Sequence, residues 1–130
     1  MISVDAVKGK TDAKVKTIKK SLFDEVMAKD NKATFSQLSD ILLMAFTFGY
    51  RLNKTCPGSG VAFVNVSSID SDIVEEYARL VLYRHPEISS ENAFWQKVQE
   101  YADAGIEEIY TMMVLQNKPF NIDSLLSTDE

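Results

Sequence analysis

Cysteine and histidine are almost absent from this sequence, which has one of each, Cys56 and His85, in 130 residues. One cysteine cannot form a disulfide within the chain, which fits a reducing cytoplasm. One histidine cannot provide the histidine pair of a zinc site or of relay catalysis. No apolar run reaches the ~18 residues of a membrane span, and the first residues lack the apolar core of a signal peptide. We therefore expect a cytoplasmic protein with no membrane segment.

Internal repeats and low-complexity segments are also missing. The length falls within the usual range of one domain, and the composition is ordinary for a globular protein. We interpret residues 1–130 as a single domain, in which residues 1–12 form a flexible basic arm and residues 117–130 form a C-terminal tail. The segment from Ile2 to Val7 is alternatively a short edge strand.

Positive charge is scarce over most of the chain and concentrated at its beginning. Residues 1–20 carry six lysines against two aspartates, residues 21–60 carry equal numbers of bases and acids, and residues 61–130 carry thirteen acids against four bases. The net charge of −5 therefore hides a basic end on an acidic body. This pattern suits either an arm for a polyanion or packing between copies in a homo-oligomer, while a solvated terminus is the more common explanation.

The stretch from Thr34 to Arg51 predicts the central helix of the fold. Thr34 and Gln37 have the spacing of a capping box. Apolar residues then recur at helical spacing, and others between them make the second half apolar all round: Phe35, Leu38, Ile41, Leu42, Leu43, Met44, Ala45, Phe46 and Phe48. Such a helix is buried on every side, in a core or at an interface, and any exposed part of Leu43 to Phe46 is a candidate partner contact. We expect Gly49 to end it in a left-handed conformation.

One helix is predicted before this stretch and one strand after it. Residues from Val15 to Lys29 keep helical spacing, with the lysines on the opposite side. Val61 to Val66 is rich in β-branched and aromatic residues, which is typical of a strand. The candidate partners of this strand are Ile2 to Val7, Tyr50 to Asn53, or a second subunit.

A third helix is predicted to begin at Asp70 or Ser71 and to end at His85. Asp70 and Ser71 are good capping residues, and a residue before proline avoids helical angles. The apolar stripe of this helix comprises Ile73, Tyr77, Leu80 and Val81.

The last helix is predicted to be capped by Ser89 or Ser90 and to continue without interruption through Gly105. Its apolar residues stay in phase on both sides of the glycine. Glycine costs about 1 kcal/mol relative to alanine in a helix, and a close helix crossing would explain its presence. The predicted fold is therefore mostly α, with about four helices packed around a central buried helix and one or two short β-strands.

No combination of side chains indicates catalysis, a cofactor or a metal site. Cys56 has Lys54 nearby, and a cation can lower the pKa of a thiol, but an incidental loop cysteine is the simpler explanation. His85 stands at a helix end, where a capping role is expected. The glutamates, such as Glu75 and Glu107, lie on polar helix faces without converging on a pocket. We expect a protein that is not an enzyme.

Two groups of residues are candidate contact sites. The basic group suits salt-sensitive, sequence-independent contact with nucleic-acid phosphates. Its members are Lys8, Lys10, Lys14, Lys16, Lys19, Lys20, Arg51 and Lys54. The apolar group lies in the tail and suits contact with a partner protein. Its members are Phe120, Ile122, Leu125 and Leu126.

Several segments together resemble a known family. They are Thr34-Phe35, Asp40, Ala45, Phe48-Gly49-Tyr50-Arg51, Pro57, Phe63, and Glu100-Tyr101-Ala102 with Gly105. In order and spacing, residues 20 to 115 are similar to small accessory proteins of bacterial DNA phosphorothioation (Dnd) systems, the phosphorothioation-associated protein four family. The resemblance implies a bacterial or phage-related protein encoded near DNA modification or restriction genes. It implies no activity and no binding residues.

These observations predict a non-enzymatic accessory or adaptor subunit of a bacterial DNA-modification-linked restriction or anti-phage defence system. It would bind a larger protein of the same system, and any DNA contact through the lysines would be secondary. The alternative is a small DNA-binding regulator that uses the N-terminal lysine-rich segment. Salt-dependent DNA binding that needs the lysines would favour the regulator. A stable complex with the product of a neighbouring gene would favour the subunit.

Overall fold

The computed structural model describes residues 2–4, 7 and 13–120. Four α-helices, α2 (Lys20–Asp30), α3 (Leu38–Leu52), α4 (Ser71–Arg84) and α5 (Glu91–Tyr110), account for most of these residues. Strands β1 (Lys14–Thr17) and β2 (Val61–Asn65) pair antiparallel. A short 3₁₀-helix, η1 (Val66–Ser68), follows β2, and a short π-helix, η2 (Thr111–Leu115), follows α5. The predicted mostly α fold with a minor β element is confirmed. Among the helices of the described residues, none is long and apolar enough to cross a membrane.

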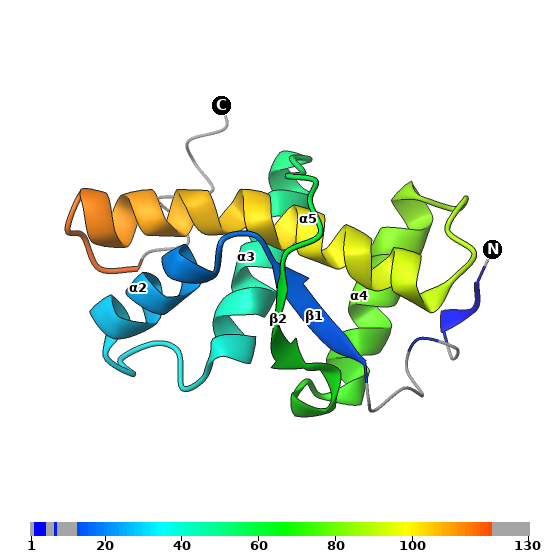
Figure 1. The fold of residues 1–130 in the computed structure, drawn as a ribbon, viewed down its shortest axis with the longest axis horizontal. Helices are drawn as coiled ribbons and strands as arrows, with labels where there is room; N and C mark the ends of the chain where they lie inside the picture. Colours follow the sequence, from blue (N-terminus) through cyan, green and yellow to red (C-terminus); the bar gives the residue numbers. More distant parts are fainter. Residues whose placement is uncertain (1, 5–6, 8–12, 121–130) are drawn as a thin grey trace.

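Helix α5 is the axis of the molecule. Figure 1 shows it along the longest dimension, with α3 crossing it and the other elements arranged along its length. Its buried face includes Phe94, Val98, Tyr101, Ala102, Ile106 and Ile109. Helix α3 buries Ile41, Leu42, Ala45, Phe46 and Phe48, but Leu43 and Met44 are half-buried, so within this chain it is not buried on every side as predicted. However, it is α5 that contacts each of the other helices and β1.

Two glycines set the distance between α3 and α5. A Cβ atom on Gly105 would lie 1.8 Å from the Ala45 carbonyl oxygen, and one on Gly49 would lie 1.9 Å from the Tyr101 carbonyl oxygen. No side chain fits at either position, so the two helix backbones meet directly. The predicted close crossing at Gly105 is therefore confirmed.

Both ends of α3 differ from the prediction. The helix begins at Leu38, and the Asp40 carboxylate accepts a hydrogen bond from the Gln37 amide at 3.3 Å, so the cap lies one turn later than Thr34. Gly49 does not end the helix, which continues to Leu52 and stops at Asn53 with a left-handed φ of 53°. Gly49 is needed for the crossing with α5 and not for chain reversal, and that cause is invisible in the local sequence.

The largest correction concerns residues 14–17, which are a strand and not the start of the first helix. In β1, Lys14 lies opposite Asn65 and Thr17 opposite Val61, and Val15 and Thr17 are the buried residues. In four residues, the alternation of a strand cannot be distinguished from the spacing of a helix. Pairing with the distant strand β2 is what makes this segment a strand. The strand at Val61 pairs with β1, and neither of the two chain segments predicted as its partner does so.

Part of the expected basic arm packs against the body. The Ile2 amide donates to the Ile88 carbonyl oxygen at 3.1 Å, and Val7 is fully buried. Val4 and Val7 are helical, so they are not an edge strand. The other residues of the segment 1–12 lie outside the described residues.

The ends of α4 and α5 confirm the predicted caps. The Asp70 side chain accepts from the Asp72 amide, and the Ser90 side chain accepts from the Ala93 amide. His85 follows the last residue of α4. Helix α5 continues through Gly105 as one helix, as predicted.

The core-facing side of α4 was only partly predicted. The buried residues are Val74, Ala78, Val81 and Leu82. Ile73 and Leu80, which the prediction placed in the core, remain 37% and 38% exposed. The sequence of α4 contains two apolar stripes, and the one that packs into the core is the stripe that contains Val74 and Ala78. The stripe that contains Ile73 borders α3 and forms part of the site described below.

Candidate functional site

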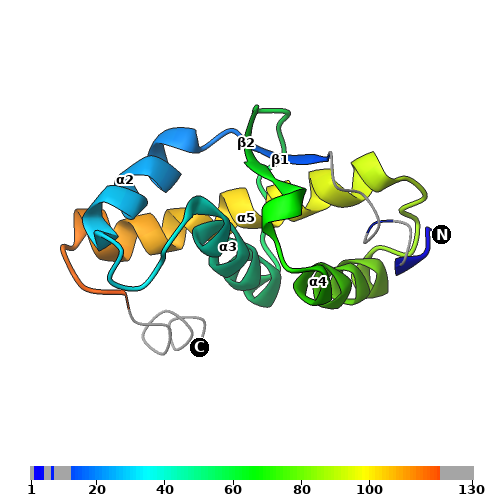
Figure 2. The ribbon, with the colours of Figure 1, turned by 90° about the horizontal axis from the view of Figure 1, so that it is seen from below.

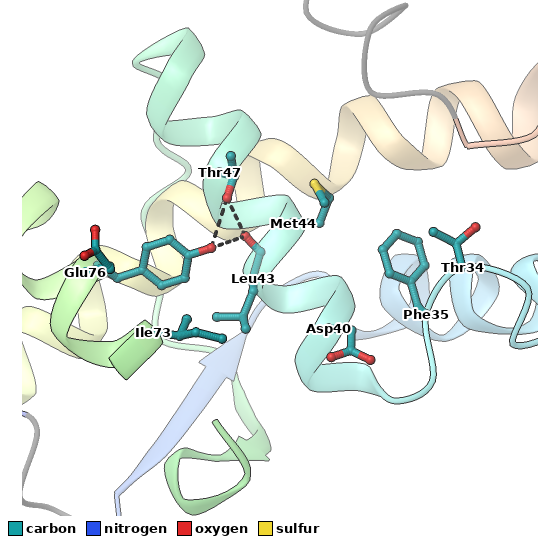
Figure 3. A pocket seen from close by; sticks show the side chains of 9 residues that line it. Thr34, Phe35, Asp40, Leu43, Met44, Thr47, Ile73 and Glu76 are labelled. Carbon is teal, nitrogen blue, oxygen red and sulfur yellow. Dashed lines mark hydrogen bonds between the residues drawn. The ribbon is translucent and has the colours of Figure 1, made fainter. Parts of the chain in front are cut away.

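A groove of about 500 Å³ lies over the first half of α3, and we call it the α3/α4 groove. Figure 2 shows α3 and α4 on the same side of α5. In Figure 3, residues of α3 lie between α4 on one side and the α2–α3 connection on the other. The lining residues, mainly apolar, are Thr34, Phe35, Asp40, Leu43, Met44, Thr47, Ile73, Glu76 and Tyr77.

Hydrogen bonds fix the wall that α4 forms. The Tyr77 hydroxyl lies 3.1 Å from the Thr47 hydroxyl and 3.2 Å from the Leu43 carbonyl oxygen (Figure 3). Burial raises the pKa of Tyr77 above its ordinary value of 10.0, and the hydrogen bond with Thr47 opposes part of the rise. The Tyr50 hydroxyl donates to the Leu80 carbonyl oxygen at 2.9 Å. Polar atoms therefore join α3 to α4, and apolar atoms beside them stay uncovered.

The opposite wall is held by Asp30, which is buried at the end of α2. Its carboxylate accepts hydrogen bonds from the Thr34 amide at 3.0 Å and from the Phe35 amide at 2.8 Å. These bonds fix the backbone of the α2–α3 connection and place the Phe35 ring against the core. The groove is therefore formed before any partner binds.

The α3/α4 groove carries negative charge. Asp40 and Glu76 are its charged lining residues, and no lysine or arginine of the described chain lines it. The Asp40 carboxylate is held by the amide and hydroxyl of Ser36, at 3.0 and 2.7 Å. Glu76 is exposed, and Arg79 lies 3.8 Å from it. An apolar groove with an acidic rim suits an apolar side chain that a basic segment carries.

The eight predicted basic contact residues do not form one surface. Three of them are paired with acids: Lys19 with Glu107 at 2.6 Å, Lys20 with Asp24 at 2.7 Å, and Lys54 with Glu108 at 3.8 Å. Lys14, Lys16 and Arg51 are exposed, and the two lysines are neighbours on β1. Lys8 and Lys10 lie outside the described residues.

The predicted apolar contact site in the tail is described only at Phe120. Its ring is half-buried, with its centroid 5.2 Å from that of Phe35 and 6.1 Å from that of Phe48. This ring therefore packs on its own domain next to the α3/α4 groove. Ile122, Leu125 and Leu126 lie outside the described residues.

The side chains considered for catalysis have structural neighbours. His85 ends α4, and its Nε2 lies 2.7 Å from the Tyr101 hydroxyl. The Cys56 amide donates to the Glu100 carbonyl oxygen at 2.9 Å, and the residue is half-buried. Within the described residues, no three histidine, cysteine, aspartate or glutamate side chains are grouped to hold a metal.

Helix α5 contains a buried acid, Asp103, that was not predicted from the sequence. This fully buried carboxylate accepts hydrogen bonds from the Thr17 hydroxyl, from the Ile18 amide at 3.1 Å and from the Gln99 side chain at 3.3 Å. Burial raises the pKa of the Asp103 carboxyl, and the hydrogen bonds oppose part of the rise. Asp103 follows Tyr101 and Ala102 on the apolar side of the helix, and this position could have indicated its burial. A buried carboxylate needs hydrogen-bond partners, and these come from distant parts of the chain.

Comparisons with models of protein families, with curated proteins and with solved structures find no match for this chain. The structure by itself describes a small, mainly helical protein whose α3/α4 groove is lined by apolar side chains and two acids. The resemblance to the phosphorothioation-associated family stays a prediction.

Proposed function

We propose that this protein is a non-enzymatic accessory subunit that binds a larger protein through the α3/α4 groove. The segment that it binds is basic and inserts an apolar side chain. The setting that we propose is a bacterial DNA-modification-linked restriction or anti-phage defence system in the cytoplasm. That part of the proposal rests on the family resemblance of residues 20 to 115.

The observation that carries the proposal is the uncovered apolar stripe of α4 beside α3. Ile73 is 37% exposed, and Leu43 and Met44 of α3 are half-buried. Burying a leucine or phenylalanine side chain contributes about 1.5–3 kcal/mol. One inserted side chain would therefore act as an anchor, and a surrounding interface would supply the remaining affinity.

Charge favours a protein partner over a nucleic acid at this groove. Asp40 and Glu76 would repel phosphate groups, and the net charge of the chain is −5. A basic protein surface would instead be attracted, and such attraction mainly increases the association rate and the specificity. These charges support a basic protein segment as the occupant.

The test compares two variants of α4 with the same change in charge. Ile73→Lys places a cation in the groove, whereas Tyr83→Lys places one at a position that is 85% exposed and outside it. Each full-length variant is co-expressed with the products of neighbouring genes, and complexes are isolated at moderate salt. We expect Ile73→Lys to lose the complex and Tyr83→Lys to keep it, with both variants folded by circular dichroism.

Two results would contradict the proposal. One is equal complex formation by the unmodified chain and Ile73→Lys, which would place the contact elsewhere. The other is a complex that persists in Ile73→Lys but is lost from a chain ending at Gln116, which would assign binding to the tail.

A second candidate function is a small DNA-binding regulator. It is favoured by Lys14 and Lys16, which are both exposed and lie two residues apart on β1. Affinity for DNA that falls steeply with salt and needs these lysines, in the absence of any protein complex, would support the regulator.

A further inference from the structure

A second hollow, of about 290 Å³, lies between β1 and the first turns of α5. Its lining residues are Ala13, Lys14, Lys16, Asn92, Trp95, Gln96 and Gln99. No acidic side chain of the described residues lines it, in contrast to the α3/α4 groove. We call it the β1/α5 hollow. Because two lysines and no acidic side chain of the described residues line it, the hollow suits an anion.

Lys14 and Lys16 supply the positive charge. Residues two apart on a strand share one face and lie about 7 Å from each other, and both lysines are exposed. Neither forms an ion pair with a residue in the described ranges, whereas Lys19, Lys20 and Lys54 do. Two adjacent like charges repel each other, so an anion between them would be stabilising.

Amide side chains of α5 form another part of the hollow. Asn92, Gln96 and Gln99 follow one another at spacings of four and three, which places them on one face of the helix. The Gly58 carbonyl oxygen accepts hydrogen bonds from Gln96 at 2.7 Å and from Gln99 at 2.8 Å. Their second N–H groups donate to Glu100 at 3.2 Å and to Asp103 at 3.3 Å, so both glutamines use their donors within the fold and form a rigid wall of the hollow. Asn92 is exposed and is the carboxamide that can donate to a ligand.

Trp95 forms part of the wall of the hollow. Its side chain lines the hollow and is 7% exposed, and its indole N–H has no hydrogen-bond partner among the described residues. The N–H has almost no accessible surface, so Trp95 is a wall and a reporter of binding here and is not counted as a donor to the ligand.

We infer that the β1/α5 hollow binds a phosphate group, carried by a small nucleotide-like molecule or by a nucleic-acid backbone. Phosphate oxygens accept hydrogen bonds from the ammonium groups of Lys14 and Lys16 and from the exposed carboxamide of Asn92, and bonds to charged groups are the strong ones. The volume is at the lower end of the range for ligand pockets, about 300 Å³. It therefore suits a phosphate with its sugar and not a larger cofactor. This site is independent of the α3/α4 groove.

The only tryptophan of the chain, Trp95, provides a direct readout. The full-length protein is titrated with inorganic phosphate, a nucleoside 5′-monophosphate, the matching nucleoside, single-stranded DNA and duplex DNA. The indole N–H resonance is followed by NMR, together with tryptophan fluorescence. We expect phosphate-bearing ligands to shift the resonance and the nucleoside to leave it unchanged. A shift with inorganic phosphate or the monophosphate would identify a small ligand, and a shift with DNA alone would identify the backbone.

Matched double variants test the role of the two lysines. Lys14→Gln with Lys16→Gln keeps most of each side-chain stem and removes both charges. We expect it to weaken binding about 100-fold, since each lost charged hydrogen bond costs about tenfold. Lys20→Gln with Lys54→Gln makes the same change in net charge and should bind like the unmodified protein.

The inference fails if no phosphate-bearing ligand moves the Trp95 resonance of the unmodified protein at low salt. It also fails if the two double variants weaken binding equally, because binding would then follow net charge alone. Loss of the protein complex in Ile73→Lys with normal phosphate binding would confirm that the two sites are separate. Failure at one site can thus be distinguished from failure at the other.

Discussion

Replacing Gly105 by alanine tests the helix crossing on which this fold depends. In an ordinary helix, this substitution would stabilise the protein by about 1 kcal/mol, because alanine is the better helix former. Here the new Cβ atom would lie 1.8 Å from the Ala45 carbonyl oxygen and 2.9 Å from the Gly49 amide nitrogen. The structure therefore predicts an effect of the opposite sign.

The magnitude follows from the movement that the new methyl group requires. A carbon atom and a carbonyl oxygen approach to about 3.3 Å, so α3 and α5 would have to separate by roughly 1.5 Å. A gap of 0.5–1 Å already loses about a quarter to a half of the dispersion attraction at each contact. Overpacking costs about 1–3 kcal/mol, and a clash with backbone atoms falls at the upper end. After the gain of about 1 kcal/mol in helix propensity, we expect a net loss of about 2 kcal/mol.

Urea denaturation of the full-length protein measures this loss directly. The control is Ala104→Gly, one residue earlier on α5 at a half-buried position, which should lose about 1 kcal/mol through helix propensity alone. Gly49→Ala should resemble Gly105→Ala, because its Cβ atom would lie 1.9 Å from the Tyr101 carbonyl oxygen. A Gly105→Ala protein as stable as the unmodified chain, or more stable, would refute the argument.

Two further predictions concern the core and the buried acid. Leu42→Ala should lower the free energy of unfolding by roughly 2–5 kcal/mol, since Leu42 is fully buried and its truncation leaves a cavity; a loss below about 1 kcal/mol in urea melts would show that α3 is not central. Because burial raises the pKa of Asp103 above its ordinary value of 3.8, the folded state binds more protons between the two pKa values. Its contribution to stability is therefore fully present below about pH 3.8 and is lost as pH rises through the folded pKa. Asp103→Asn should remove this pH dependence, and parallel stability curves for the two proteins between about pH 3 and pH 8 would disprove it.

The α3/α4 groove and the β1/α5 hollow could not have been predicted as sites from the sequence. The groove combines Phe35, Leu43 and Ile73, and the hollow combines Lys16 with Asn92. Lys14 and Lys16 were predicted as contact residues, but their neighbours on α5 were not. The predicted helix at residues 15–29 gave no reason to place these lysines on a strand beside α5. Any exposed part of Leu43 to Phe46 was predicted as a partner contact, but the sequence did not show which residues are exposed, since a partly covered stripe has the same spacing as a buried one.

The sequence by itself determined the features that depend on neighbours within a turn or two. These are the helical class, the caps at Asp70 and Ser90, the stop at His85, and the continuity of α5. Capping and helical periodicity are local, because each involves residues at most a few positions apart.

Only the tertiary structure decided the features that join distant segments. Val15 became a strand residue because it pairs with Val64, and Gly49 stayed inside a helix because the backbone of Tyr101 lies against it. Asp103 is buried because Thr17, 86 positions earlier in the chain, supplies a hydrogen bond. In each case, the energy of a contact between distant segments exceeded the local preference, which is at most about 1 kcal/mol for these residues.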